Sequence, residues 1–197
     1  MSKGVLAYCH PDVYPMAPDA FFRNRGDGTF EEATTAAGLV DATGKGLGVV
    51  TLDIDADGAT DLYVANDSTP NFLFHNRGDG SFEEVALYLG VGHNEDGKTE
   101  AGMGTDAGDA NGDGWLDLFV TNLNNEPNAL YLGGEVMFAY HTRFSGLVEP
   151  SFRSVGFGTH FADLDNDGDL DLVVTNGHVV DNVALSDPSQ SFRQPGQ

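Results

Sequence analysis

The chain has 197 residues, of which 9 are Lys or Arg and 31 are Asp or Glu, and its formal net charge is −22. This charge excludes a protein that binds the nucleic-acid backbone, and no apolar run is long enough to cross a membrane. One cysteine excludes an intrachain disulfide framework, while 40% hydrophobic residues over this length suffice for a sizeable core.

Residues 1–19 contain three prolines, which predicts an irregular N-terminal arm. The first residues lack the apolar core of a signal peptide, so either the mature chain is intracellular or the sequence is a processed or truncated piece. Weak calcium sites of the kind described below belong outside cells, which favours the second. Cys9 lies in this arm without a nucleophile motif around it, so an inert thiol is favoured over a reactive one.

Two short β-prone runs around a Gly/Asp turn occupy residues 21–32, and the pattern recurs at 73–84 and, degraded, at 130–138. Each is typical of a β-hairpin, here called an outer hairpin. The Arg-Gly-Asp tripeptide at 25–27 and 77–79 resembles an integrin-recognition motif. Because both copies lie at the same place in a turn that needs glycine, we interpret them as turn chemistry and assign them no adhesion role.

An aspartate-rich loop follows each outer hairpin, and it occurs three times, at 53–61, 109–117 and 163–171. In every copy, oxygen-bearing side chains occupy positions 1, 3, 5 and 9, and glycine occupies position 6, where a sharp turn needs a positive φ. This spacing predicts Ca²⁺ loops in which position 7 adds a backbone carbonyl. The predicted ligands are Asp53, Asp55, Asp57, Ala59 and Asp61; Asp109, Asn111, Asp113, Trp115 and Asp117; and Asp163, Asp165, Asp167, Asp169 and Asp171.

An EF-hand begins in the same way but places Glu at position 12, where this chain has Val64, Val120 and Val174. Short β-rich runs follow directly, so the loops open strands and not helices. Simple polar turns are the plainer interpretation. Three copies with the same oxygen positions favour metal binding, with about three Ca²⁺ per chain.

A Gly-x-Gly pair precedes each loop, as at Gly46 and Gly48. Such glycines are expected where the backbones of neighbouring units approach each other closely around a central axis. Strand, loop and strand form an inner half, and an inner half with an outer hairpin makes a four-stranded unit. Since the loops start 56 and 54 residues apart, the sequence predicts an all-β fold, a β-propeller built of four-stranded blades.

The chain resembles the FG-GAP/VCBS family of calcium-binding propeller blades, as in integrin α-subunit heads. It is most similar to the propeller part of proteins with an ASPIC/UnbV domain, whose phrases include Cys9-His10-Pro11 and Asn176-Gly177-His178. The resemblance implies Ca²⁺ as cofactor and an extracellular or cell-envelope location.

We expect the arm at 1–19 to be followed by blades over 20–197. These are an outer half at 20–34, blades at 46–91 and 102–147, and an inner half at 156–197. The two halves make one blade, so the chain carries about three blades, fewer than the four to eight that close a propeller. We therefore predict a six-bladed homodimer in which the halves of two chains complete each other. The rival is a fragment of a larger propeller.

The function that these features favour is a non-catalytic recognition module, stabilised by calcium, for a protein or glycan. The alternative is a glycoside hydrolase or polysaccharide lyase with its site at the central channel or the dimer interface. Asp106 and His160 occupy equivalent places on inner strands and are the candidates for acid–base work, although polar residues that only line a wet channel are the more common case. Trp115, at a loop rim, is a candidate for stacking on a sugar ring.

Overall fold

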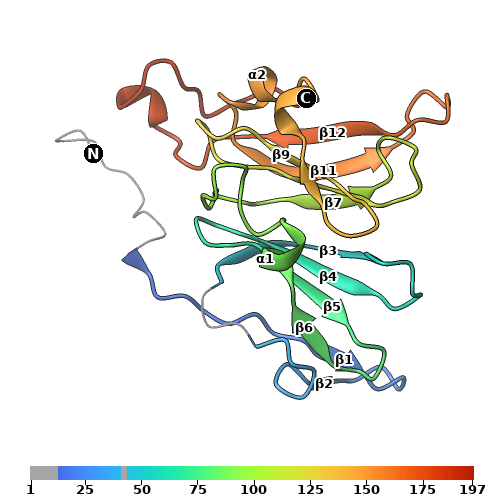
Figure 1. Cartoon of the computed structure of the whole chain (residues 1–197). Helices are drawn as coiled ribbons and strands as arrows, with labels where there is room; N and C mark the ends of the chain where they lie inside the picture. Colours follow the sequence, from blue (N-terminus) through green and yellow to red (C-terminus); the bar gives the residue numbers. More distant parts are fainter. Residues whose placement is uncertain (1–12, 41–43) are drawn as a thin grey trace.

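The computed structural model describes residues 13–40 and 44–197. Across these residues the chain forms two four-stranded and two two-stranded sheets, all antiparallel (Figure 1). Cys9 and most of the predicted N-terminal arm lie outside the described residues. Among the helices of the described part, none has the length and apolar character needed to span a bilayer.

The two complete sheets are meanders in which each strand pairs with its neighbour in sequence. Blade 1 consists of β3 (Gly46–Leu52), β4 (Asp61–Asn66), β5 (Phe72–Asn76) and β6 (Phe82–Glu84). Blade 2 consists of β7 (Thr105–Gly108), β8 (Asp117–Val120), β9 (Ala129–Leu132) and β10 (Ala139–Tyr140).

The two-stranded sheets are half-blades. The outer half-blade pairs β1 (Phe22–Asn24) with β2 (Phe30–Glu32), and the inner half-blade pairs β11 (Gly156–Ala162) with β12 (Asp171–Asn176). Short helical segments fill connections: α1 (Ala86–Leu89), η2 (Thr142–Phe144), α2 (Val148–Ser151) and η3 (Val183–Leu185).

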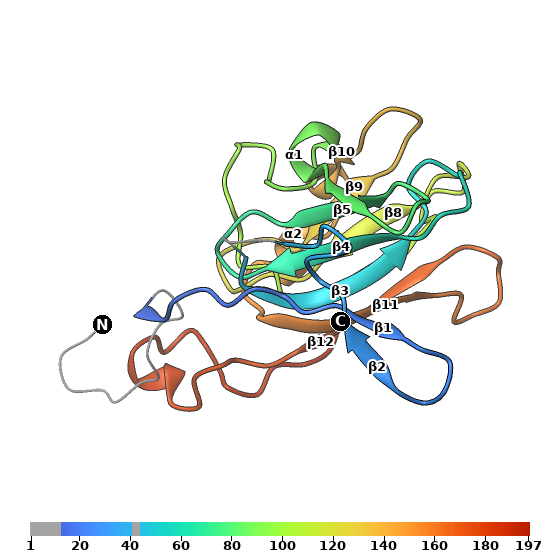
Figure 2. The same ribbon diagram turned by 90° about the horizontal axis from the view of Figure 1, so that it is seen from below.

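The sheets stack face to face, which confirms the predicted all-β fold of propeller-like, four-stranded blades. The half-blades lie at opposite ends of this stack (Figure 1), and Figure 2 views it from the end that carries β1 and β2. The first strands of successive sheets adjoin: β3 contacts β7, and β7 contacts β11. These strands are called the inner strands below.

Glycines allow the inner strands to approach closely. A β-carbon at Gly48 would overlap the carbonyl oxygen of Met103, and one at Gly104 would overlap the carbonyl oxygen of Phe157. The second glycine of the first two Gly-x-Gly pairs therefore faces a backbone carbonyl from the neighbouring inner strand or the residues just before it. The hydroxyl of Thr121 reinforces the second junction, because it accepts the N–H of Gly104 at 2.8 Å and lies 2.8 Å from the Phe157 carbonyl.

Apolar side chains fill the spaces between sheets, as alternation along the strands requires. The cluster between blades 1 and 2 includes Leu52, Tyr63, Leu73, Leu118, Val120 and Tyr131. Blade 2 meets the inner half-blade through Phe119, Leu130, Phe161 and Val174. The outer half-blade and its following turn meet blade 1 through Phe21, Leu39, Val64, Phe72 and Phe74.

An asparagine lies at or just after the end of the second strand of each unit, and its side chain donates to the carbonyl of a proline further along the chain. The Nδ2 of Asn66 donates to the carbonyl of Pro70 at 2.8 Å, and the Nδ2 of Asn122 donates to the carbonyl of Pro127 at 2.7 Å. Asn176 repeats the bond with Pro195 at 2.9 Å. The first two asparagines are almost fully buried, so these bonds offset the cost of desolvating their amides.

The connection between blades 1 and 2 is held by the carboxylate of Glu100. It accepts the side-chain N–H groups of Asn94 at 3.1 Å and Asn122 at 3.2 Å. Burial raises the pKa of Glu100 to about 7, against the lowering effect of these donors. The carboxylate of Glu126 lies near enough to Glu100 to raise its pKa further.

The glycine contacts give a stability prediction. Gly104→Ala places a β-carbon against the carbonyl of Phe157, so blades 1 and 2 are forced away from the inner half-blade. We expect a loss of about 1–3 kcal/mol in the free energy of unfolding, measured by urea denaturation. Gly177→Ala is the control, because a β-carbon there meets open space and should change stability little. Equal stability of the two variants would contradict the close approach.

Candidate functional site

The three aspartate-rich loops fold by the same internal hydrogen bonds. In loop 1 (53–61) the two carboxylate oxygens of Asp53 accept the N–H groups of Asp57 at 3.2 Å and Gly58 at 2.9 Å. Asp57 in turn accepts the N–H of Ala59. The carboxylates at positions 1 and 5 thus bend the backbone around themselves.

Loops 2 (109–117) and 3 (163–171) repeat every one of these bonds. Asp109 accepts the N–H groups at positions 5 and 6 at 3.1 and 2.9 Å, and Asp163 accepts the equivalent pair at 3.1 Å each. Position 5 accepts the N–H of position 7 in both loops. Three independent sequences therefore give one loop geometry.

Two loop positions need a left-handed backbone. Position 6 is glycine throughout, with φ of 86°, 92° and 99° in the three loops, as the sequence predicted. Position 4 is also left-handed, and here the residues are Ala56 at φ 58°, Gly112 at 73° and Asn166 at 62°. Asparagine and glycine tolerate this region, whereas alanine does so at a cost of roughly 1–2 kcal/mol.

The position-9 aspartate joins each loop to the rest of its blade. In blade 1, Asp61 accepts the N–H of Ile54 at 2.9 Å with one oxygen and the N–H of Asn76, at the end of β5, at 2.7 Å with the other. In blade 2, Asp117 does the same with Ala110 and Gly133 at 2.8 Å each. Both aspartates are fully buried.

The inner half-blade has only the first of these two bonds. One oxygen of Asp171 accepts the N–H of Leu164 at 3.1 Å. No third strand follows β12 within the described part of the chain, and Asp171 is exposed.

The carboxylates gather as a divalent cation requires. Oxygens of Asp53, Asp55 and Asp57 lie within 4.8 Å of one another, and in loop 3 those of Asp163, Asp165 and Asp171 do so. The donor set, carboxylate oxygens and turn backbone, is the one that Ca²⁺ prefers, so the residues fit this ion. Loop 2 offers the amide oxygen of Asn111 where the other loops have a carboxylate.

Burial of a loop carboxylate disfavours its ionised form, and a bound cation would offset this cost. Desolvation raises the pKa of Asp117 above its usual range, and repulsion from Asp113 and Asp109 adds to this effect. The N–H groups of Gly133 and Ala110 act in the opposite direction. A bound divalent cation favours the ionised forms of all these groups.

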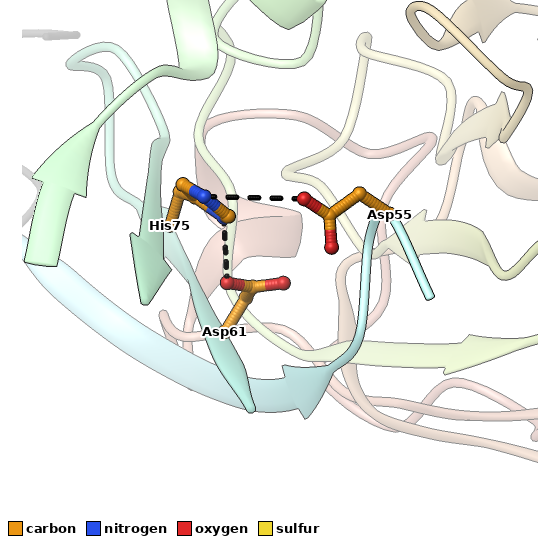
Figure 3. A group of neighbouring side chains, drawn as sticks. All are labelled: Asp55, Asp61 and His75. Atoms are coloured by element: carbon orange, nitrogen blue, oxygen red, sulfur yellow. Dashed lines mark hydrogen bonds and ion pairs between the residues drawn. The ribbon is translucent and has the colours of Figure 1, made fainter. Parts of the chain in front are cut away.

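His75 brings a potential imidazole ligand to loop 1, which the sequence did not predict. Its ring lies beside loop 1, with Nδ1 3.1 Å from Asp61 and Nε2 3.9 Å from Asp55 (Figure 3). The three side chains form a further group with potential ligand atoms within 4.8 Å. In the sequence, the only indication that His75 lies beside loop 1 is its position in the hairpin, next to Asn76. The equivalent residues of the other two units are Arg23 and Leu132.

The structure brings together the two residues considered for acid–base chemistry. His160 Nδ1 lies 2.8 Å from Asp106 Oδ2, and the same oxygen accepts the N–H of Phe161 at 2.7 Å. The histidine is 75% exposed, and the aspartate is 17% exposed. The pair thus bridges the inner strands β7 and β11, which is sufficient as a structural role. Trp115 is half-buried at the rim of loop 2.

Stacked four-stranded meanders with aspartate loops between their first two strands define a protein built from propeller-type repeats. The family model for the FG-GAP-like repeat matches residues 10–64, 53–120 and 109–174. Since these matches cover most of the chain, the protein belongs to the FG-GAP-like repeat family.

Three curated relatives share 27% identity with the chain. They are cartilage acidic protein 1 of Homo sapiens over 194 residues, of Xenopus tropicalis over 170 and of Mus musculus over 190. The matches cover 89%, 81% and 89% of this chain. The chain spans about a quarter of the length of these relatives, between 25% and 27%.

The strained position 4 of loop 1 gives a prediction. Ala56→Gly removes the steric cost of an alanine in the left-handed backbone conformation, and glycine is the residue that loop 2 has at this position. Glycine loses more conformational entropy on folding than alanine, and this cost is subtracted from the steric gain. We therefore expect a net increase of about 0.5–1 kcal/mol in the free energy of unfolding. The measurement is urea denaturation in millimolar Ca²⁺.

Ala59→Gly serves as the matched control, because Ala59 has an ordinary negative φ. It should lower stability by about 0.5–1 kcal/mol. A shift of both variants in the same direction would show that the backbone at position 4 carries no strain.

Proposed function

We propose that the protein is a calcium-stabilised β-propeller module that recognises a protein or glycan and has no catalytic role. The observation that carries this proposal is the threefold repetition of one loop geometry with oxygen-bearing side chains at positions 1, 3, 5 and 9, in which three carboxylates converge in loop 1 and three in loop 3. A chain that needed only polar turns has no reason to repeat this donor set. About three Ca²⁺ per chain would be held, one in each loop.

The charge of the chain supports metal binding. Three divalent cations would reduce the formal net charge from −22 to about −16. Their positive charge would fall where carboxylates are most crowded, so it would relieve the repulsion that opposes folding. Backbone carbonyls of Ala59, Trp115 and Asp169 would complete the three coordination shells.

Exposed apolar side chains beside loop 1 support a recognition role. Tyr88 is 79% exposed, Val136 78% and Met137 54%, and these three line a groove with Asp55 and His75. Exposed aromatic and thioether groups next to charge are typical of interaction surfaces. The family and the name of the relatives favour an extracellular location, where millimolar Ca²⁺ fills weak sites.

A second copy of the chain is a further proposed partner. The outer half-blade of one chain and the inner half-blade of another have the strands of one complete blade between them. Two chains joined in this way at both ends form a six-bladed ring with twofold symmetry.

The main prediction concerns calcium and stability. Because metal binds the folded loops and not the unfolded chain, each site filled at 100 times its dissociation constant adds about 2.7 kcal/mol. Thermal unfolding in 5 mM EDTA should therefore occur many degrees below that in millimolar Ca²⁺. Asp163→Ala should reduce the difference, whereas Asp96→Asn, in an exposed connection, should leave it unchanged. Equal melting temperatures in EDTA and Ca²⁺ would overturn the proposal.

The hydrogen bond between Asp106 and His160 supports one alternative function, that of a glycoside hydrolase or polysaccharide lyase. A panel of nitrophenyl glycosides and polyuronate substrates tests it, with His160→Ala and Asp106→Asn as controls. We expect no turnover above that of the variants, because no second free carboxylate accompanies the pair among its described contacts. Turnover by the native chain that both variants lose would establish the enzyme instead.

A further inference from the structure

Two asparagines of this chain are followed directly by glycine. They are Asn111, at position 3 of loop 2, and Asn176, at the end of β12. An asparagine in this context can lose its side-chain amide, because glycine has no side chain that hinders the attack of its backbone nitrogen on the neighbouring amide carbon. Since the dipeptide is the same at both sites, any difference in reactivity between them comes from the fold.

At the first site the backbone nitrogen that would attack is free. Asn111 and Gly112 are both exposed, and the N–H of Gly112 makes no hydrogen bond within residues 13–40 and 44–197. A β-carbon at Gly112 would meet nothing within 4 Å, so the space around this backbone is open. The nitrogen can therefore reorient towards the side chain of Asn111 without the loss of a hydrogen bond of its own.

The second site is held from both sides. The N–H of Gly177 donates to the carbonyl of Val155 at 3.0 Å, and the Nδ2 of Asn176 donates to the carbonyl of Pro195 at 2.9 Å. Asn176 also pairs with Gly156 on the neighbouring strand. Attack at this site requires the first two bonds to break, so the fold suppresses the reaction there.

The same contrast exists inside loop 2. Asp113 also precedes a glycine, and an aspartate in this context can undergo the same ring closure with loss of water. There, however, the N–H of Gly114 donates to Asp109 Oδ2 at 2.9 Å, as the position-6 N–H does in loops 1 and 3. The carboxylate at position 1 thus protects this step of the loop, whereas the step from Asn111 to Gly112 has no such protection.

Asp113 prepares the amide of Asn111 for attack. The N–H of Asp113 donates to Asn111 Oδ1 at 2.9 Å, and this oxygen gains negative charge when a nitrogen adds to the amide carbon. Asp113 Oδ2 accepts the Nδ2–H of Asn111 at 2.9 Å, so the leaving nitrogen lies beside a carboxylate that favours its protonated form. Both contacts favour charges that develop during the reaction.

We propose that Asn111 is a site of spontaneous deamidation, and that this reaction remodels the calcium loop of blade 2. The backbone nitrogen of Gly112 gives up its proton and forms a bond to Cγ of Asn111. The bond from Cγ to Nδ2 breaks, and Nδ2 takes up a proton and leaves as ammonia. Water then opens the resulting succinimide ring at either carbonyl, which gives aspartate or isoaspartate. Nothing is oxidised or reduced, because one amide and one water become one carboxylate and one ammonium ion.

The aspartate product gives loop 2 the ligand set of the other loops. Loops 1 and 3 have a carboxylate at position 3, Asp55 and Asp165, where loop 2 has the amide of Asn111. Ca²⁺ binds a carboxylate more strongly than a neutral amide oxygen, since the charge of the ligands tunes the affinity of such loops. This consequence rests on the calcium binding proposed above, whereas the deamidation itself does not.

The isoaspartate product has the opposite effect. The main chain then runs through the former side chain of residue 111 and is longer by one methylene group before Gly112. Asp109 can no longer accept the N–H groups of both Asp113 and Gly114, which lie at 3.1 and 2.9 Å in the unmodified loop. This product therefore weakens Ca²⁺ binding by loop 2.

Peptide mapping tests the reaction itself. The full chain is kept in EDTA at neutral pH, below the melting temperature of the metal-free protein, and trypsin then separates the two sites into fragments 99–143 and 154–193. Mass spectrometry detects and locates the replacement of an amide by a carboxylate. Asn111 should react at least tenfold faster than Asn176 in the folded chain, and both should react at similar rates in concentrated urea. Equal rates in the folded chain, or a faster reaction at Asn176, would overturn the inference.

Gly112→Ala tests the role of the attacking nitrogen. The added methyl group hinders its approach, and loop 1 accommodates alanine in this backbone conformation, as Ala56 at φ 58°. The rate at Asn111 should fall at least tenfold, with no change at Asn176. Gly177→Ala is the matched control and should leave the rate at Asn111 unchanged. A Gly112→Ala chain that deamidates at the native rate would contradict attack by this nitrogen.

Asn111→Asp isolates the consequence for calcium, because it reproduces the aspartate product without isoaspartate. The weakest Ca²⁺ site, measured by titration calorimetry, should bind at least fivefold more tightly than in the native chain. Asn166→Asp adds the same charge at position 4 of loop 3, which supplies no ligand, and should change this site little. If Asn111→Asp binds Ca²⁺ as the native chain does, the remodelling of loop 2 is wrong. If no variant binds Ca²⁺, the proposed calcium-stabilised module fails while the deamidation stands.

Discussion

One buried carboxylate in each blade links the loop to the sheet. The oxygens of Asp61 and Asp117 accept one N–H from their own loop and one from the end of the third strand. A buried ionised group is costly unless such bonds satisfy it. In blades 1 and 2 this carboxylate therefore fixes the hairpin in register with the loop, whereas loop 3 has the same internal hydrogen bonds without a third strand among the described residues.

The arrangement of blades depends on a second constraint, the absence of side chains where inner strands meet. At Gly48 and Gly104 the backbone of the next strand occupies the space of a β-carbon. The sheets therefore come closest along their inner strands, and larger side chains such as Tyr63 and Phe119 fill the space between neighbouring sheets. This difference in spacing gives each sheet its wedge shape.

Much of this architecture follows from short-range pattern. Short β-prone runs, turn glycines and the spacing of the aspartates predict four-stranded units and their loops, because each of these signals acts within about ten residues. The glycine pairs also predict a close approach of backbones. The structure agrees with these inferences on the fold.

Other features depend on contacts between distant residues and have no local signal. The left-handed conformation of Ala56 follows from the loop network, although alanine itself disfavours it. His75 reaches Asp61 only because β5 pairs with β4, and its counterparts Arg23 and Leu132 differ in chemistry. Nothing in the sequence around Glu100 indicates that its carboxylate is partly buried and accepts the side-chain N–H of Asn122.

The similarity of the outer hairpins at 21–32 and 73–84 has a consequence for folding. Both carry nearly the same residues, so either one satisfies the pairing rules of the β3–β4 pair. During synthesis the hairpin at 21–32 emerges first, and it is the first candidate that β3 and β4 meet. A nascent chain in which the hairpin at 21–32 pairs with β4 would have to release it before β5 can take its place, so local repetition is a source of kinetic competition.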